Sequence, residues 1–203
     1  MRPALILAGL GLAAAILLAG LDQLTRERIA DERKQRALSA VSAMLSGIEY
    51  DNDLLEDTTS LSVPELADPV TIYRARLRSQ PVAAVMDVVT PAGYSGDIRL
   101  LVAADIEGTV LGVRILEHRE TPGLGDKIER GKSDWVEQFE DTSLENPPAK
   151  DWAPDRRDGA FDTVTSATIT SAAVIDAVKR VLRAFESSKR NLFETAENKE
   201  DTD

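Results

Sequence analysis

The hydrophobic positions follow different patterns along the chain, beginning with an unbroken apolar run. This run extends from Pro3 to Leu21 and contains no charged residue. At about 1.5 Å per helical residue it nearly covers a hydrocarbon core of about 30 Å. A cleavable signal peptide is the alternative, but residues 17–21 lack a convincing small-x-small cleavage site. Residues 1–22 are therefore predicted to form an uncleaved transmembrane anchor.

A helical stripe follows the apolar run, from Gln23 to about Ser46. Its apolar members lie on one side of a helix with charges between them: Leu24, Ile29, Ala37, Val41, Met44 and Leu45. This helix is either a stalk that packs on the domain or a partner-binding helix, and we favour the stalk. Asp51 to Pro69 is acidic, rich in Ser and Thr, and contains prolines, which predicts a linker with little regular structure. Residues 23–69 are thus expected to be stalk helix and linker.

Alternating and β-branched runs occupy the middle of the chain and are separated by turn signals. The predicted strands are Val70 to Leu77, Pro81 to Val89, Asp97 to Ile106, and Thr109 to Leu116. Glu107 and Gly108 stand between the last two runs as a hairpin turn. Because each run follows its neighbour through a short connection, an antiparallel sheet is expected.

Helical spacing returns after the predicted sheet. Lys127 to Phe139 suits short helical turns, and the prolines at 147 and 148 end them. Residues 161–170 are predicted to be strand and turn, and Ser171 to Phe193 a long helix. Its apolar face would comprise Val174, Ala177, Val178, Val181, Leu182 and Phe185. The predicted fold is α+β: one N-terminal transmembrane helix and a helical stalk, then a mostly antiparallel sheet packed with helices over residues 70–195. The charged tail 196–203 is expected to be disordered.

Composition narrows the chemistry. The chain has 203 residues with a formal net charge of -11, which argues against nucleic-acid binding because phosphate contacts need clustered Lys and Arg. It has no cysteine, which excludes disulfides, thiol catalysis and iron–sulfur ligation by thiolates. His118 is the single histidine, so a zinc site is not expected. Any redox chemistry must come from a bound organic cofactor.

The segment Asp162 to Thr168 reads Asp-Thr-Val-Thr-Ser-Ala-Thr. By residue pattern alone it is equally well a strand that enters a helix through a capping hydroxyl. It resembles the Asp-x-x-Ser/Thr-Gly-Ala-Thr signal of the bacterial flavin transferase, which esterifies the phosphate of FMN onto the final threonine, here Thr168. Ser166 stands where that signal usually has glycine.

A second segment, His118 to Gly125, contains Glu-Thr-Pro-Gly-Leu-Gly. Pro122 sets the first central dihedral of a turn and Gly123 supplies the positive φ that a type II turn needs. Taken alone, the segment is an ordinary turn. It resembles the signature of the FMN-binding domain shared by the G subunit of the Rnf-type electron transport complex and the C subunit of the sodium-pumping NADH:quinone oxidoreductase. The loop Pro91 to Gly96, of the Gly-Tyr-x-Gly kind, also recurs in that family.

The resemblance implies which residues meet the cofactor. Thr168 would carry FMN covalently, surrounded by Ser166, Ala167, Ile169 and Thr170. The contact face for the isoalloxazine ring would comprise Glu120, Thr121, Gly123, Leu124 and Gly125. No catalytic residue and no metal ligand is expected. Asp162 would serve recognition by the transferase or stabilise a turn, and the two interpretations are equally supported.

The same resemblance implies the function. The chain would be the electron-carrier subunit of a membrane-bound ion-translocating oxidoreductase, not catalytic alone, with other membrane subunits, a flavin transferase and the lipid bilayer as partners. Basic residues after the anchor would by themselves draw that side to the cytoplasm. The family nevertheless implies a single-pass protein of the bacterial inner membrane with its domain in the periplasm. A C-type subunit and a non-catalytic membrane-anchored periplasmic scaffold are the alternatives, but a scaffold does not explain why the two flavin signatures occur together.

Overall fold

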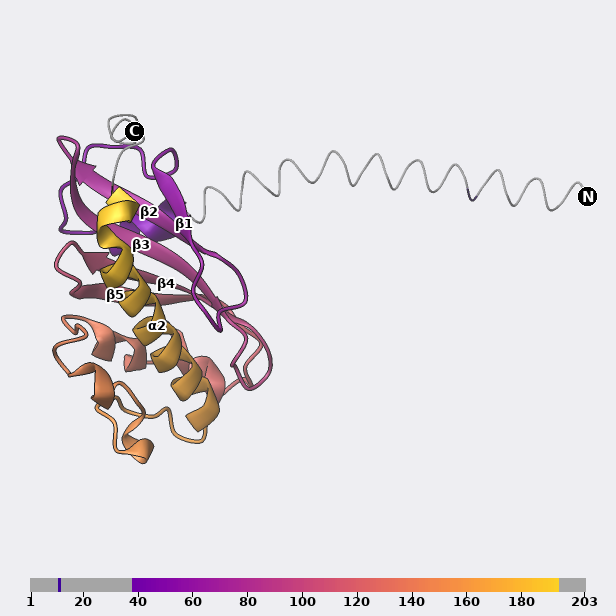
Figure 1. The fold of residues 1–203 in the computed structure, drawn as a ribbon. Coiled ribbons are helices and arrows are strands. Elements are labelled where there is room, and N and C mark those ends of the chain that lie inside the picture. The colour runs from indigo at the N-terminus through magenta and orange to yellow at the C-terminus, as the bar shows by residue number, and fades with distance from the viewer. Residues whose placement is uncertain (1–10, 12–37, 194–203) are drawn as a thin grey trace, which may run out of the picture. The chain divides into compact units, whose positions relative to one another are not determined.

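A computed structural model describes residue 11 and residues 38–193 (Figure 1). Apart from residue 11, the predicted anchor lies outside these residues, as do most of the predicted stalk and the acidic tail. No helix among the described residues has both the length and the apolar character that a membrane span requires. Residues 41–193 belong to one compact unit. At its start, residues 41–44 are helical, in agreement with the expected stripe, and Val41 and Leu45 are buried.

The centre of the unit is a five-stranded antiparallel sheet in which every strand pairs with its neighbour in the sequence (Figure 1). Its strands are β1 (Thr58–Leu61), β2 (Val70–Leu77), β3 (Gln80–Thr90), β4 (Ile98–Asp105) and β5 (Val110–Glu117). The four predicted strands are confirmed, with small shifts at their ends. The sheet is therefore the meander that the turn signals predict.

Strand β1 corrects the prediction for residues 51–69, which were expected to have little regular structure. It pairs with β2 from Thr58 opposite Tyr73 to Leu61 opposite Val70. Polar contacts hold this segment in place, and a search for periodic hydrophobic positions does not detect such contacts. Asp57 forms an ion pair with Arg76 at 2.7 Å and another with Arg74.

The long helix α2 (Thr168–Phe193) lies across one face of the sheet (Figure 1). Its buried side packs into one hydrophobic core with alternate residues of the strands, for example Met86 of β3 and Leu100 of β4. Alternate side chains of a strand point to opposite faces, so Asp87 lies on the face away from α2. The helix thus supplies the main cover of the sheet, as its apolar face predicts.

The start of α2 corrects a second expectation. Residues 161–170 do not form a strand: Phe161 makes only an isolated bridge to Pro154, and the helix begins at Thr168 rather than at Ser171. The β-branched residues at 168–170 favour a strand by propensity, but packing of the following apolar face draws them into the first helical turn.

Short 3-10 helices connect β5 to α2. They are η1 (Gly125–Ile128), η2 (Trp135–Phe139), η3 (Ala149–Asp151) and η4 (Asp155–Arg157). The first two agree with the helical turns expected between 127 and 139. Phe139 stacks on Phe161 at 5.0 Å, and Trp152 lies 4.6 Å from Phe161, between ring centroids. This aromatic cluster fixes the long connection just before α2 begins.

Candidate functional site

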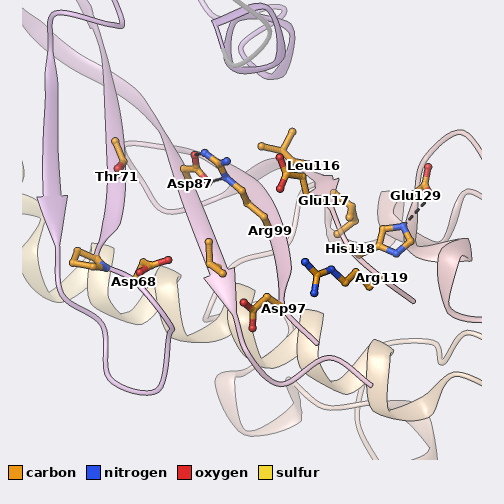
Figure 2. A pocket seen from close by; sticks show the side chains of 13 residues that line it. Asp68, Thr71, Asp87, Asp97, Arg99, Leu116, Glu117, His118, Arg119 and Glu129 are labelled. Atoms are coloured by element: carbon orange, nitrogen blue, oxygen red, sulfur yellow. Dashed lines mark hydrogen bonds and ion pairs between the residues drawn. The ribbon is translucent and has the colours of Figure 1, made fainter. Parts of the chain in front are cut away.

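Two cavities differ in size and in the residues that line them. The larger, of about 850 Å³, lies at the ends of β2 to β5 (Figure 2). The smaller, of about 420 Å³, is lined by Tyr94, Glu120, Thr121, Leu124, Gly125, Ser166, Ala167, Thr168, Ile169 and Thr170. Every residue that the sequence assigned to a flavin site lines this second cavity except Gly123. The two signatures, far apart in the sequence, therefore meet around one cavity, and this convergence rather than size identifies the candidate site.

Thr168 is half-buried and is the first residue of α2. The N–H groups of a first helical turn have no acceptor within the helix, and the helix dipole places partial positive charge there. A phosphate at this position meets an environment suited to anions. The loop before it is fixed because Ser171 Oγ donates to the Ala167 carbonyl at 3.0 Å and accepts from the Val164 N–H at 3.0 Å.

Ser166 has φ +69°, in the left-handed region. The flavin-transferase signal usually has glycine here, and glycine adopts this conformation without strain, whereas an L side chain costs roughly 1–2 kcal/mol. Serine therefore takes here a conformation that the usual glycine would adopt without strain. Its side chain is exposed at the edge of the cavity.

The turn at Thr121 to Leu124 has the shape that its sequence predicts. Gly123 has φ +77°, and the Leu124 N–H donates to the Thr121 carbonyl at 3.1 Å. The turn leaves the Leu124 side chain 44% exposed against the cavity. Gly123 does not line the cavity, so its part is to shape the turn.

Glu120 joins the separate segments of the site. The residue is only 5% exposed, and each carboxylate oxygen accepts one hydrogen bond. Oε2 accepts from Thr170 Oγ1 at 2.6 Å, and Oε1 accepts from the Ser95 N–H at 3.1 Å. Gly125 is required beside it, because a Cβ there would stand 2.9 Å from the Glu120 side chain. One carboxylate thus ties the loop between β3 and β4 to the turn and to the first turn of α2.

A network of charged side chains and one histidine stabilises the turn at Thr121 to Leu124 on the side away from the cavity residues. His118 Nδ1 accepts the Glu120 N–H at 3.0 Å, which leaves Nε2 to donate to Glu129 at 2.9 Å. Lys132 bonds both Asp126 at 2.8 Å and Glu129 at 3.0 Å. The hydrogen bond from Lys132 lowers the pKa of Asp126, and the bonds from His118 and then Lys132 lower the pKa of Glu129. His118 therefore contacts the backbone of the turn at Glu120 without lining the smaller cavity.

The larger cavity has a different character. Asp87 is 8% exposed and pairs with Arg99 through two contacts of 2.9 and 2.6 Å. The hydrogen bond to Asp87 raises the pKa of Arg99. Figure 2 shows this pair beside carboxylates at Asp68, Asp97 and Glu117, which line the same hollow. None of the residues assigned to the flavin site lies here.

Tyr94 lines the smaller cavity but was not among the predicted site residues. The sequence signal that could have identified Tyr94 was the Gly-Tyr-x-Gly loop in which it stands. Asp162, in contrast, lines neither cavity. Its backbone is held at both ends, because its N–H donates to Gln138 at 2.7 Å and its carbonyl accepts from Trp135 Nε1 at 2.7 Å.

Comparison with known proteins adds the family. The family described as the FMN-binding domain matches residues 93–183, which include the Tyr94 loop, the turn and Thr168. A protein named as the G subunit of an ion-translocating oxidoreductase complex, from Pseudomonas aeruginosa (strain UCBPP-PA14), is 38% identical over 196 residues, covering 95% of this chain and 92% of the relative. The protein of the same name from Escherichia coli (strain K12) is 42% identical over 165 residues, 81% of this chain and 80% of the relative. The one from Shewanella loihica (strain ATCC BAA-1088 / PV-4) is 39% identical over 185 residues, 90% and 87% of the two chains.

Proposed function

The chain belongs to the family of G subunits of ion-translocating oxidoreductase complexes, and we propose that it carries electrons on an FMN joined by a phosphoester to Thr168. It is a redox subunit of a larger complex and not a catalyst alone. The observation that supports the tether is the cavity of about 420 Å³ in which both flavin signatures meet around Thr168.

The residues present fit the two ends of FMN. At one end, the hydroxyl of Thr168 and the free N–H groups of the first helical turn suit a phosphate ester. At the other end, Leu124 and Ile169 expose apolar side chains to the cavity, which suits a flat heteroaromatic ring. When bound, FMN supplies the redox chemistry by accepting and releasing electrons, and the chain holds and orients it.

The exposure of the site supports a covalent tether. Ile169 is 50% exposed and Leu124 44%, so the cavity is open to solvent at its apolar side. A cofactor held only by contacts is lost whenever it dissociates, whereas a covalent link keeps its local concentration high without a closed pocket. An open site also lets partner subunits approach the ring for electron transfer.

The cellular setting follows from the family and the N-terminal sequence. We infer a single-pass protein anchored in the bacterial inner membrane by residues 1–22, with its flavin domain in the periplasm. Its partners are the other membrane subunits of the complex, and a flavin transferase attaches the FMN, reading the Asp162 to Thr168 segment.

Intact-mass measurement after co-expression with a flavin transferase tests the tether. The expected product gains the mass of FMN less one water and fluoresces in a denaturing gel. Thr168→Ala should abolish both signals, whereas the neighbouring Thr165→Ala should leave them. An adduct that persists in Thr168→Ala, or a wild-type chain without added mass, would refute the assignment.

A further inference from the structure

The exposed large hydrophobic side chains of the described residues gather at one place. Tyr94 is 68% exposed, Ile169 50% and Leu124 44%, and all three line the cavity of about 420 Å³ beside Thr168. A single exposed apolar side chain is ordinary on a protein surface. Several around one cavity indicate a surface that a ligand covers.

These three side chains come from separate elements but are held relative to one another. Tyr94 precedes Ser95, whose N–H donates to Glu120, and Ile169 precedes Thr170, whose hydroxyl donates to Glu120. The loop that carries Tyr94 is confined as well, because a Cβ at Gly93 would stand 2.9 Å from Glu120 Oε1. The position of Tyr94 is therefore set by the same carboxylate that sets the turn and the start of α2.

We propose that Tyr94 is a ring-binding residue of the flavin site: its phenol ring packs on the isoalloxazine, which Leu124 and Ile169 also contact. This inference rests on the proposed function and adds an aromatic contact to it. Two aromatic rings that pack offset or edge to face gain interaction free energy beyond that of the apolar area they bury. The hydroxyl of such a tyrosine can stay in contact with water at the edge of the site. Covering by the ring explains why a large side chain stands exposed on a loop that is otherwise fixed.

The emission of the attached flavin tests this directly. A tyrosine ring is electron-rich and quenches an excited flavin that it touches, so flavinylated Tyr94→Leu should emit more strongly than the wild type. Tyr50→Leu, which changes a tyrosine that lines neither cavity, is the matched control and should emit like the wild type. Equal emission from Tyr94→Leu and Tyr50→Leu would overturn the proposal.

A binding measurement on the full chain expressed without the transferase supplies a second readout. Riboflavin, which lacks the phosphate, is the probe for ring contacts alone. Tyr94→Leu should weaken its binding about two- to tenfold, and Tyr94→Phe should keep most of it. Failure of the proposed function is distinguishable, because the wild type would then show no added FMN mass, whereas failure of this inference leaves a flavinylated wild type with an unchanged Tyr94→Leu spectrum.

Discussion

Separating Glu120 from Thr170 should loosen the flavin site, because this contact joins the turn to the start of α2. The Glu120 carboxylate is buried and accepts from Thr170 Oγ1 at 2.6 Å and from the Ser95 N–H at 3.1 Å. Thr170 is 1% exposed, so water does not replace the lost partner at that end. Thr170→Val keeps the shape of the side chain and removes only the hydroxyl.

The expected magnitude follows from these contacts. A hydrogen bond to a charged group contributes about 1.5–3 kcal/mol, so Thr170→Val should lower the free energy of unfolding by about 2 kcal/mol. Glu120→Ala loses two such bonds, and because Ser95 is exposed and can be hydrated, we expect a loss of about 3–4 kcal/mol. Glu120→Gln should cost less, since its amide can still accept from one of the two donors.

A double-mutant cycle on the protein without flavin, measured by urea unfolding, isolates the pair. The coupling between Glu120→Ala and Thr170→Val should be about 1.5–3 kcal/mol. Glu120→Ala should also give a lower yield of FMN-bearing chain than Glu120→Gln, because the segments around Thr168 are no longer tied together. Additivity of the two substitutions within about 0.5 kcal/mol would refute the role given to this carboxylate.

Other predictions concern the backbone, charge and topology. Ser166→Gly should relieve the strain at φ +69° and raise the free energy of unfolding by about 1 kcal/mol, which thermal unfolding would show as a midpoint higher by about 2–4 °C. Ser166→Ala, the control, should bring no gain. Gly123→Val has free space around its Cβ but φ +77°, so it should cost about 1 kcal/mol or more and impair electron transfer by the complex while the FMN mass remains; normal transfer would contradict this. Because Lys132 lowers the pKa of Asp126, ionised Asp126 stabilises the fold at pH values above its ordinary pKa of 3.8, and this contribution is lost as the pH falls through the lower pKa of the folded state. In urea unfolding, Lys132→Ala should therefore lose less stability in acid than the wild type does. An equal loss in the two proteins would exclude the ion pair as its source. A reporter active only in the periplasm, fused after Asp203, should be active, and a silent one beside an active cytoplasmic fusion would invert the topology.

The sheet could be predicted from the sequence because its strands carry their own signals. Val70–Leu77 has the predicted bounds, and the other three predicted strands differ only at their ends. Strand β1 was missed because it lies at the sheet edge, half exposed, and is held by Asp57 and its arginine partners rather than by an apolar face. The start of α2 was predicted three residues too late. Local propensity at residues 168–170 favours a strand, but packing of the apolar face of α2 into the core favours a helix there.

The site was predictable to the extent that motifs carried it. The turn signature specified a positive φ at Gly123, which the structure has. No local pattern could reveal that Glu120 reaches Thr170, because that contact depends on how α2 docks on the sheet. Tyr94 stood in a recognisable loop, but its position beside Thr168 likewise arises only from the tertiary fold.

The neighbour-to-neighbour order of the strands has a consequence for how this domain is made. Each pairing of the meander closes a short loop, whereas the bonds that complete the cavity join residues 25 and 50 positions apart. Closing longer loops costs more chain entropy and is slower, so the sheet can form before the cavity does. The cavity therefore exists only after the last element, α2, has docked, and a chain that displays Thr168 beside its turn is one that has finished folding.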